Sequence, residues 1–556
     1  MIAKLTPLFV ASLLLCGCDN DNDIVEVTET TEVAQEVEDT TTVKNVILMI
    51  GDGMGPQQVG LLEEYAMRAP QSIYNDKNNK TAMSMLAKEG HVGFSLNAPY
   101  GATGSLVTDS ACSATQLATG KPAGSEMIGL HEKGNIVETI LEKAKNAGKS
   151  TGLVSDTRLT HATPASFASH QPHRSLEPAI AVDMISSGMV DVMLSGGARA
   201  LLPSDIKSNE AKRQMMKDLG APESLYKKSK RKDERNILLE ARDTYGYSLA
   251  FDNTQLAESE ATKLLGIFSN SGMANGIAYK ACKKANNCTQ PSLKDMTVKA
   301  LDILSKDEDG FFLMIEGGQI DWAGHANDAG WMLSELIKFD EAIEAVYEWA
   351  KDRNDTLVVV TADHETGSFG LSYSIKDIPE AKMLDGDGMQ GQEYHPNFNF
   401  GSLDKLDRLY AQTGTFYDML SHVNSDWDFS NTNGHEWAEA INLYSDFKVT
   451  PDKAAPIAER HDNEYHDPDH SILSQEIFPK INDYKEFYVY GNEIHANLIA
   501  RALGSDQNIV WGTGTHTAAP VPVFAFGPEA ITKQFSSMQH HVYVSQKMMT
   551  ALGLEI

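Results

Sequence analysis

The chain has 556 residues and a formal net charge of −30, from 47 basic and 77 acidic side chains. Its 42% hydrophobic and 22% charged residues are typical of a globular protein with a large core. So large an acidic surplus argues against a nucleic-acid-binding surface, which needs Lys and Arg against phosphates, and against docking on anionic lipid. A small anionic substrate remains compatible with it where one site is locally positive.

The first 17 residues predict export. One Lys precedes an apolar run that is too short to span a hydrocarbon core of ~30 Å, as in a signal peptide. The run ends in Leu15-Cys16-Gly17-Cys18, which resembles a bacterial lipobox. We therefore expect a periplasmic protein anchored to the membrane through lipidated Cys18. Cleavage without lipid, giving a secreted protein, is the alternative.

Residues 18–42 form the next segment, with nine acidic and no basic side chains. This composition is typical of a disordered, self-repelling tether. We expect the folded catalytic part to span residues 43–556.

Apolar runs that alternate with helical patterns organise the rest of the chain. Near-continuous apolar runs indicate strands buried on both faces. Helices are expected at Ile136–Ala147, which stops at Gly148, and at Trp331–Asp352. The pattern predicts an α/β fold with a large mixed, mostly parallel central sheet and helices on both faces. The expected strands are Val46–Ile50, Thr151–Val154, Val190–Leu194, Phe311–Ile315, Thr356–Val360 and Val521–Phe526.

Residues 371–490 lack this alternation and are interpreted as a long insertion or accessory region. The region contains a run of possible metal ligands, although a solvated loop is the simpler interpretation. These are His461, Asp462, His466, Asp467 and His470.

The cysteines outside the signal segment divide into a pair and a single residue. Cys282 and Cys288 lie six residues apart, and export makes a local disulfide the expected state, with two free thiols as the alternative. Cys112 is interpreted as a small buried hydrophobic residue.

Polar motifs follow three of the expected strands, where parallel α/β sheets bind their ligands. They read GDGMG, EGGQIDWAGH and TADHE. Carboxylate and imidazole groups together suit zinc, and a pair four residues apart shares one face of a helical turn. The candidate zinc ligands are Asp321, His325, Asp363, His364 and His516.

Oxygen ligands suit a hard ion such as Mg²⁺, and Asp52, Glu316 and Thr163 could supply them. Taken alone, Thr163 is more typical of a helix N-cap before Pro164. GDGMG also allows a dinucleotide-binding turn, but it is a poor match to GxGxxG.

The segment TDSACSATQLATGKPAG places Ser110 at the start of a short helix. Free amides and the helix dipole favour negative charge there, and a metal ion can activate a serine hydroxyl. The alternative is that Asp109 and Ser110 only cap the helix. Arg174 offers a planar donor suited to phosphate oxygens, although an isolated arginine is most often a surface residue.

Six motifs occur in one order between Asn45 and Pro528: GDGMG, TDSACSAT, HATPA, EGGQIDWAGH, TADHETG and GTGTH. In this the chain resembles the alkaline phosphatase family, and most of all its exported marine bacterial (Vibrio) type with a large surface insertion. The resemblance implies a homodimer that hydrolyses small phosphate monoesters through a phosphoserine on Ser110. Arg174 would bind the phosphate, and Asp109 would orient Arg174.

The resemblance also implies two zinc ions and one magnesium ion. Asp321, His325 and His516 would bind the first zinc ion. Asp363 and His364 would bind the second, with Asp52 bridging to the magnesium ion, whose other ligands would be Glu316 and Thr163. His161 and Trp322 stand where enteric relatives have Asp and Lys near the third ion and the phosphate. The third ion could therefore be cobalt instead.

Two other functions remain open from the sequence. One is a phosphodiesterase or sulfatase that shares the metal core. The other is a periplasmic protein that binds metal or phosphate without turnover, for which a nucleophile at Ser110 would have no use.

Overall fold

The computed structural model describes residues 42–491 and 493–556. The predicted signal segment, Cys18 and all of the predicted tether except Thr42 lie outside the described residues. Among the helices of the described part, none combines the length and the apolar character needed to cross a membrane.

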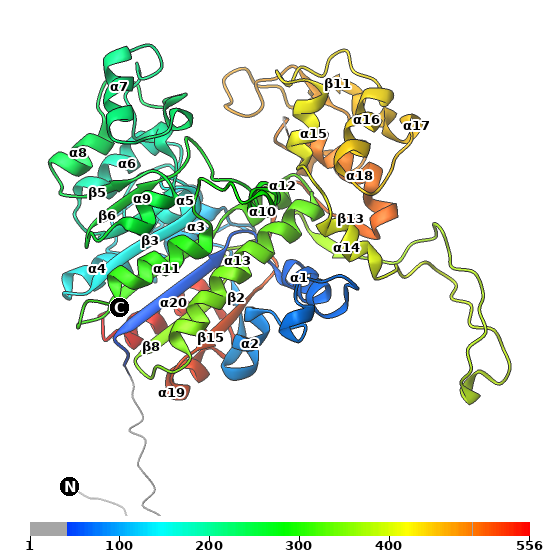
Figure 1. Cartoon of the computed structure of the whole chain (residues 1–556), viewed down its shortest axis with the longest axis horizontal. Coiled ribbons are helices and arrows are strands. Elements are labelled where there is room, and N and C mark those ends of the chain that lie inside the picture. The colour runs from blue at the N-terminus through cyan, green and yellow to red at the C-terminus, as the bar shows by residue number, and fades with distance from the viewer. Residues whose placement is uncertain (1–41, 492) are drawn as a thin grey trace, which may run out of the picture. The chain divides into compact units, whose positions relative to one another are not determined.

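A ten-stranded sheet forms the centre of the fold (Figure 1). Strand β15 is antiparallel to both of its neighbours, and every other pair in the sheet is parallel. The predicted fold class, a mostly parallel α/β sheet, is thereby confirmed. The order across the sheet is β16 (Met538–His540), β2 (His91–Leu96), β15 (Val521–Phe526), β8 (Thr356–Thr361), β1 (Asn45–Gly51), β7 (Phe311–Gly317), β3 (Ser150–Arg158), β4 (Val192–Gly196), β6 (Leu264–Ile267) and β5 (Ser248–Ala250).

Both faces of the central strands are buried, as their apolar runs predict. In β1, Ile47 and Met49 pack into one hydrophobic cluster, whereas Val46, Leu48 and Ile50 pack into the other. The first cluster includes side chains of α1 (Pro56–Arg68), α2 (Ala82–Glu89), α11 (Leu293–Leu304) and α13 (Ala329–Ala350). The second includes side chains of α3 (Ser110–Thr119), α4 (Ile140–Asn146), α6 (Glu177–Ser186), α8 (Ile237–Asp243) and α20 (His541–Ala551).

The predicted start of one helix is wrong. Helix α4 begins at Ile140 rather than Ile136, and Ile136 is 71% exposed. The Thr139 hydroxyl accepts a hydrogen bond from the Glu142 amide, and the Glu142 carboxylate accepts one from the Thr139 amide. This capping box fixes the helix start. Gly148, with φ of +85°, follows its end as expected.

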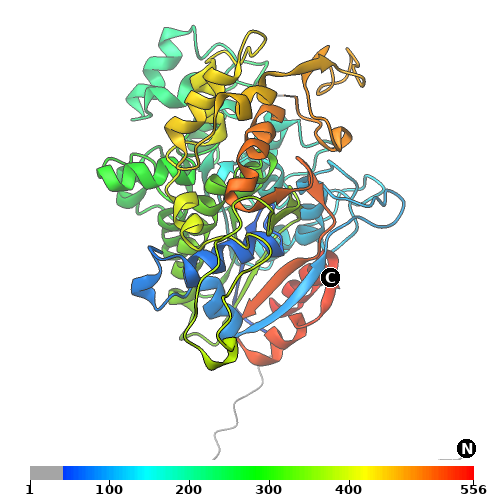
Figure 2. The same ribbon diagram turned by 90° about the vertical axis from the view of Figure 1, so that its right-hand side faces the viewer.

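The region 371–490 contributes no strand to the central sheet. It contains α14 (Asp404–Tyr410), α15 (Phe416–Val423), α16 (Gly434–Tyr444), α17 (Pro451–Ala454) and the strand pair β11 (Arg460–Asp462) and β12 (Ile477–Pro479). Helices α15 and α16 lie beside α18 (Ile494–Gln507) in both views (Figure 1, Figure 2). In this region His466, Asp467 and His470 are exposed, and the His461–His470 stretch forms no group of three metal-ligand atoms among the described residues.

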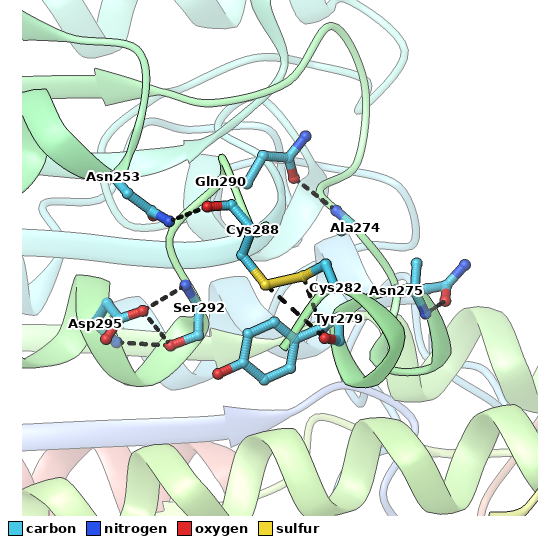
Figure 3. The surroundings of a disulfide bond; sticks show 10 residues. Asn253, Ala274, Asn275, Tyr279, Cys282, Cys288, Gln290, Ser292 and Asp295 are labelled. Carbon is cyan, nitrogen blue, oxygen red and sulfur yellow. Dashed lines mark hydrogen bonds between the residues drawn. A yellow bond between two sulfur atoms is a disulfide. The ribbon is translucent and has the colours of Figure 1, made fainter. Parts of the chain in front are cut away.

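Cys282, in α10 (Gly276–Ala285), forms a disulfide with Cys288, which confirms the expected pairing (Figure 3). The Asn253 side chain donates a hydrogen bond of 2.9 Å to the Cys288 carbonyl and holds the far end of this short loop. Cys112 is a buried free thiol, also as expected.

Candidate active site

Three neighbouring parallel strands deliver carboxylates to one edge of the sheet. Asp52 follows β1, Glu316 lies near the end of β7, and Asp363 follows β8. Strand β1 lies between β7 and β8, and Ile50 of β1 pairs with both Glu316 and Thr361. All three carboxylates are fully buried. The strand-end rule therefore places these predicted residues correctly.

A second set of side chains comes from α12 (Gln319–His325) and β14 (His516–Thr517). The Nε2 atoms of His325 and His516 lie 3.4 and 3.5 Å from Oδ1 of Asp321, and 3.1 Å from each other. On each ring, Nδ1 is within hydrogen-bond distance of a backbone carbonyl, Gly514 at 2.7 Å and Thr108 at 3.0 Å. Both Nε2 atoms are thereby turned toward Asp321.

His364 joins the two sets. Its Nε2 atom lies 3.3 Å from Oδ2 of Asp363 and 3.5 Å from Oδ1 of Asp52. Its ring stacks on that of His516, with 3.6 Å between the ring centroids. The pairing of β14 with β9 (Glu365–Thr366) brings His516 to this position.

The oxygen-rich group lies around Glu316. Ser155 and Thr157 donate hydrogen bonds to its Oε2 atom, the second at 3.0 Å. Its Oε1 atom has no hydrogen-bond partner in the described structure and lies 4.0 Å from Nδ1 of His161, which also lacks one. Thr163 lies within α5 (Ala162–Ala165), and its hydroxyl is likewise without a partner. His161 occupies the N-cap position, so the N-cap interpretation of Thr163 is wrong.

The electrostatics of this cluster suit cations. Burial and the nearby Asp363, Asp321 and Glu316 carboxylates raise the pKa of Asp52 well above its usual range. Burial, then Asp321, raises the pKa of Asp363 to about 8. Burial also acts to raise the pKa of Asp321, but the neighbouring imidazoles of His325 and His516 outweigh it and lower the pKa.

Side-chain atoms that could bind a metal ion form three groups, and within each group the atoms lie within 4.8 Å of one another. Neither carboxylate oxygen of Asp52 has a hydrogen-bond partner in the described part of the chain. Buried carboxylates without donors are stable when they bind a metal ion, and mixed oxygen and imidazole donors suit divalent ions. The residues present therefore fit bound metal. The three groups are Asp321, His364 and His516; Asp52, Asp363 and His364; and Asp52, His161 and Glu316.

The GDGMG turn serves this cluster directly. The Gly53 amide donates a hydrogen bond of 3.1 Å to Oδ1 of Asp363. Gly53 has φ of +74°, and a Cβ atom there would lie 2.8 Å from the Cα atom of Asp321. The turn therefore needs glycine to pack α12 against β1, and its amide binds a carboxylate rather than a pyrophosphate.

Ser110 is the first residue of α3 and is almost fully buried. Asp109 is the N-cap and accepts hydrogen bonds from the amides of Ala111 and Cys112. Ser110 itself is not the cap, because it is the first residue inside the helix, and its Oγ atom lies 3.1 Å from Nε2 of His364.

Arg174 donates a hydrogen bond of 3.0 Å to Oδ2 of Asp109, so the helix cap also holds the arginine. Burial acts to lower the pKa of Arg174, but Asp109 and Asp52 outweigh it and raise the pKa. The arginine is therefore charged at any working pH.

A cavity of about 1030 Å³ opens onto these groups and is lined by Ser110, Arg174, His161 and Trp322, among others. The rings of His161 and Trp322 meet edge to face, with 6.0 Å between their centroids. Burial, then the charge of Arg158, lowers the pKa of His161 well below its usual value, so the imidazole is neutral.

Some residues that contact the buried cluster or line the cavity were not predicted from the sequence. Ser155 and Thr157 follow a predicted strand, so the strand-end rule could have found them. Glu493 and Tyr490 carry no motif; Oε2 of Glu493 lies 3.9 Å from Nδ1 of His325, and the Tyr490 ring meets the His325 ring edge to face.

Similarity to known proteins agrees with this geometry. A family model described as "Alkaline phosphatase" matches residues 43–554. Alkaline phosphatase 3 of Bacillus subtilis (strain 168) is 30% identical over 92% of this chain and 90% of its own length. Alkaline phosphatase 4 of the same organism is 34% identical over 67% of this chain and 71% of its own. The crystal structure of Thermus thermophilus alkaline phosphatase, at 23% identity, has the same fold, with a TM-score of 0.69 over 93% of this chain and 92% of that one. Six ordered motifs, their convergence on one buried cluster and a family match over nearly the whole described chain show that this protein belongs to the alkaline phosphatase family.

Proposed function

We propose that this protein hydrolyses phosphate monoesters to an alcohol and inorganic phosphate through a phosphoserine on Ser110. The observation that carries the proposal is the position of the Ser110 hydroxyl. It lies at the start of a helix, 3.1 Å from His364, in the same cavity as the charged Arg174. Membership of the alkaline phosphatase family supports the same reaction.

The chain's own residues would act mainly by position and charge, as is usual in phosphoryl transfer. Oγ of Ser110 would form a bond to phosphorus while the bond from phosphorus to the alcohol oxygen breaks. Water would then break the bond between Ser110 and phosphorus and restore the hydroxyl. Arg174 would bind nonbridging phosphate oxygens, and its contact with Asp109 would hold the guanidinium in place.

Metal ions are part of the proposal, and the family is metal-dependent. Asp321, His325 and His516 would hold one zinc ion, and Asp363 and His364 would hold a second. Asp52, Glu316 and Thr163 would hold magnesium. When bound, such ions supply positive charge that favours an ionised hydroxyl or water and offsets the charge of the leaving oxygen. His161 beside Glu316 adds an imidazole to the third group, so cobalt is an alternative there.

The N-terminal segments and the oligomeric state belong to the same proposal. Export is supported by the signal-like residues 1–17 and by family membership, and a lipid on Cys18 by the lipobox-like sequence. Replacing Cys18 by Ser should move the protein from the membrane fraction to the periplasm or medium. We also propose a homodimer of the marine Vibrio type, with residues 371–490 as its insertion; a monomer by light scattering would contradict this.

The decisive experiment is release of phosphate from an aryl monophosphate, with and without EDTA. Ser110→Ala should abolish turnover, and EDTA should abolish wild-type activity. Ser186→Ala, at an exposed position at the end of α6, is the matched control and should leave the rate unchanged. Equal rates in wild type and Ser110→Ala would refute the mechanism. Faster cleavage of an aryl sulfate or a bis-aryl phosphate would instead favour the related sulfatase or phosphodiesterase reaction.

A further inference from the structure

Three aromatic side chains line the catalytic cavity and have no assigned role. Tyr484, Phe487 and Tyr490 lie in one short segment, and all three line the cavity that contains Ser110 and Arg174. Their exposed fractions are 67%, 53% and 37%. Exposing large apolar rings to water is unfavourable, and rings gathered at the mouth of a site mark it as a binding surface.

The segment is held in place by the same turn that carries His516. The Phe487 carbonyl accepts hydrogen bonds from the Gly514 amide at 3.2 Å and the Thr513 hydroxyl at 2.9 Å. The Gly514 carbonyl in turn is 2.7 Å from Nδ1 of His325. The turn at Thr513 and Gly514 therefore holds the aromatic segment and the imidazoles of His325 and His516 in a fixed relative position.

The backbone at Tyr484 is also in an uncommon conformation. Its φ is +51°, in the left-handed region that bulky side chains rarely adopt. Such conformations persist where the surrounding structure determines them, often at ligand sites. Here the conformation begins the short 3-10 turn Lys485–Phe487, whose last residue, Phe487, lines the cavity.

A chain of contacts places the aromatic segment relative to the nucleophile. Ser110 contacts His364, the His364 ring stacks on His516, and His516 contacts His325. The Tyr490 ring then meets the His325 ring at 5.4 Å between centroids. Tyr490 is thus linked to Ser110 through three packed imidazole rings, and both residues line the same cavity. In an in-line displacement the leaving oxygen departs on the side opposite to the nucleophile, so an alcohol that leaves toward His325 would meet this segment.

We propose that Tyr484, Phe487 and Tyr490 form a leaving-group subsite that selects phosphate monoesters whose alcohol carries a flat aromatic group. Aromatic pairs stack or meet edge to face with a favourable energy beyond simple burial, which a small polar alcohol cannot provide. The inference rests on the proposed function for its reaction, but binding at the subsite is measurable without turnover.

The test compares phenethyl phosphate with ethyl phosphate, because both have primary alcohols as leaving groups and only one carries a ring. Wild type should show the higher kcat/KM for phenethyl phosphate. Phe487→Ala should lower kcat/KM for phenethyl phosphate roughly three- to tenfold, the range expected for losing one ring contact. It should leave the value for ethyl phosphate and the inhibition constant of inorganic phosphate unchanged within error. Phe487→Tyr should retain the preference because it keeps the ring.

Tyr484→Ala is a second variant in case Phe487→Ala fails to fold, and it should also lower the preference. Tyr543→Ala is the control, because Tyr543 is 53% exposed on α20 and does not line the cavity. An equal loss for both substrates, or a wild type without preference, would overturn the subsite.

The nonhydrolysable phenethylphosphonate and ethylphosphonate, titrated by calorimetry into the metal-loaded wild type and Phe487→Ala, separate the two proposals. Tighter binding of the phenethyl compound that is lost in the variant supports the subsite even if no phosphate is released. Equal binding of the two compounds to wild type refutes it, whatever the activity.

Discussion

The sharpest test of the fold concerns a buried lysine beneath the catalytic cluster. Lys338, on α13, has an ammonium group 2.9 Å from Oδ2 of Asp156 and is also paired with Glu335. The three side chains are at most 4% exposed. Lys338→Met would keep most of the side-chain volume but leave two carboxylates buried without their cation.

The expected loss of stability follows from this burial. Removing one partner of a buried ion pair typically costs about 3–5 kcal/mol of unfolding free energy. A carboxylate that has lost its cation can become neutral by binding a proton, and the free energy of that protonation is the most that the carboxylate can cost the folded state. For a group with an ordinary pKa near 4, protonation costs about 5 kcal/mol at pH 7.5 but only about 2 kcal/mol at pH 5.5. Burial already raises the pKa values of Asp156 and Glu335, against the opposing effect of Lys338. We therefore expect Lys338→Met to lose about 3–5 kcal/mol at pH 7.5 and distinctly less at pH 5.5.

The lysine and the two carboxyl groups together set the direction of this pH dependence. Burial acts to lower the pKa of Lys338, but Asp156 and Glu335 outweigh it and raise the pKa, so the wild-type lysine stays charged at both pH values. The contribution of Lys338 to the unfolding free energy is fully present below the pKa of lysine in the unfolded chain, so it is constant between pH 5.5 and pH 7.5. In the variant, the pKa values of Asp156 and Glu335 rise further in the folded state because the lysine that lowered them is gone, so the folded state binds protons more readily. The variant therefore regains stability as the pH falls.

Equilibrium unfolding in urea, with variant and wild type compared at each pH, measures the difference. Lys351→Met is the matched control, because Lys351 forms an exposed helix-surface pair with Glu348 and should leave the unfolding free energy unchanged. Adding Asp156→Asn and Glu335→Gln to Lys338→Met should recover part of the loss. A loss below about 1 kcal/mol at pH 7.5, or one that does not shrink at pH 5.5, would refute the reasoning.

Three further predictions concern the disulfide, a buried acid and the phosphate site. Replacing both Cys282 and Cys288 by Ser should lower the unfolding free energy by about 2 kcal/mol, as expected for so short a loop, and urea unfolding with no change would contradict it. Burial raises the pKa of Asp340 to about 6, so the folded state gains stability as the pH falls through that value. Relative to Asp340→Asn, wild type should therefore gain about 1.4 kcal/mol between pH 7.5 and pH 5, and a constant difference would count against it. Trp322→Lys places an ammonium group in the cavity with Arg174 and should lower the inhibition constant of inorganic phosphate roughly tenfold, so an unchanged constant would exclude a phosphate-facing position.

The strands and ligands that the sequence predicts share one physical origin. Buried parallel strands read as apolar runs, and the polar residue after each run lies at the same edge of the sheet. Asp52, Glu316 and Asp363 were predictable for this reason. Strands β2 and β5 were not, because β2 alternates buried and exposed residues and β5 has only three residues.

Contacts between distant segments account for what the sequence did not reveal. Nothing in the residues around Phe487 shows that their backbone hydrogen-bonds to Thr513 and Gly514. The pairing of Lys338 with Asp156 likewise joins a helix to a strand end far away in the chain. A similar limit applies to α4, where a local capping box at Thr139 overrides an apolar pattern that starts earlier.

The proposed substrate is an anion, and the chain that would bind it is strongly acidic. Asp52, Glu316, Asp321 and Asp363 are buried at the candidate active site, and among the described residues that line the cavity Arg174 is the only Arg or Lys. Ionised together, these carboxylates would repel a phosphate monoester, and their mutual repulsion helps to raise the pKa values of Asp52 and Asp363. The three ions proposed for the cluster would reverse the sign of its charge. Metal binding and substrate binding then become one electrostatic requirement, met inside the cavity and independent of the acidic surface outside it.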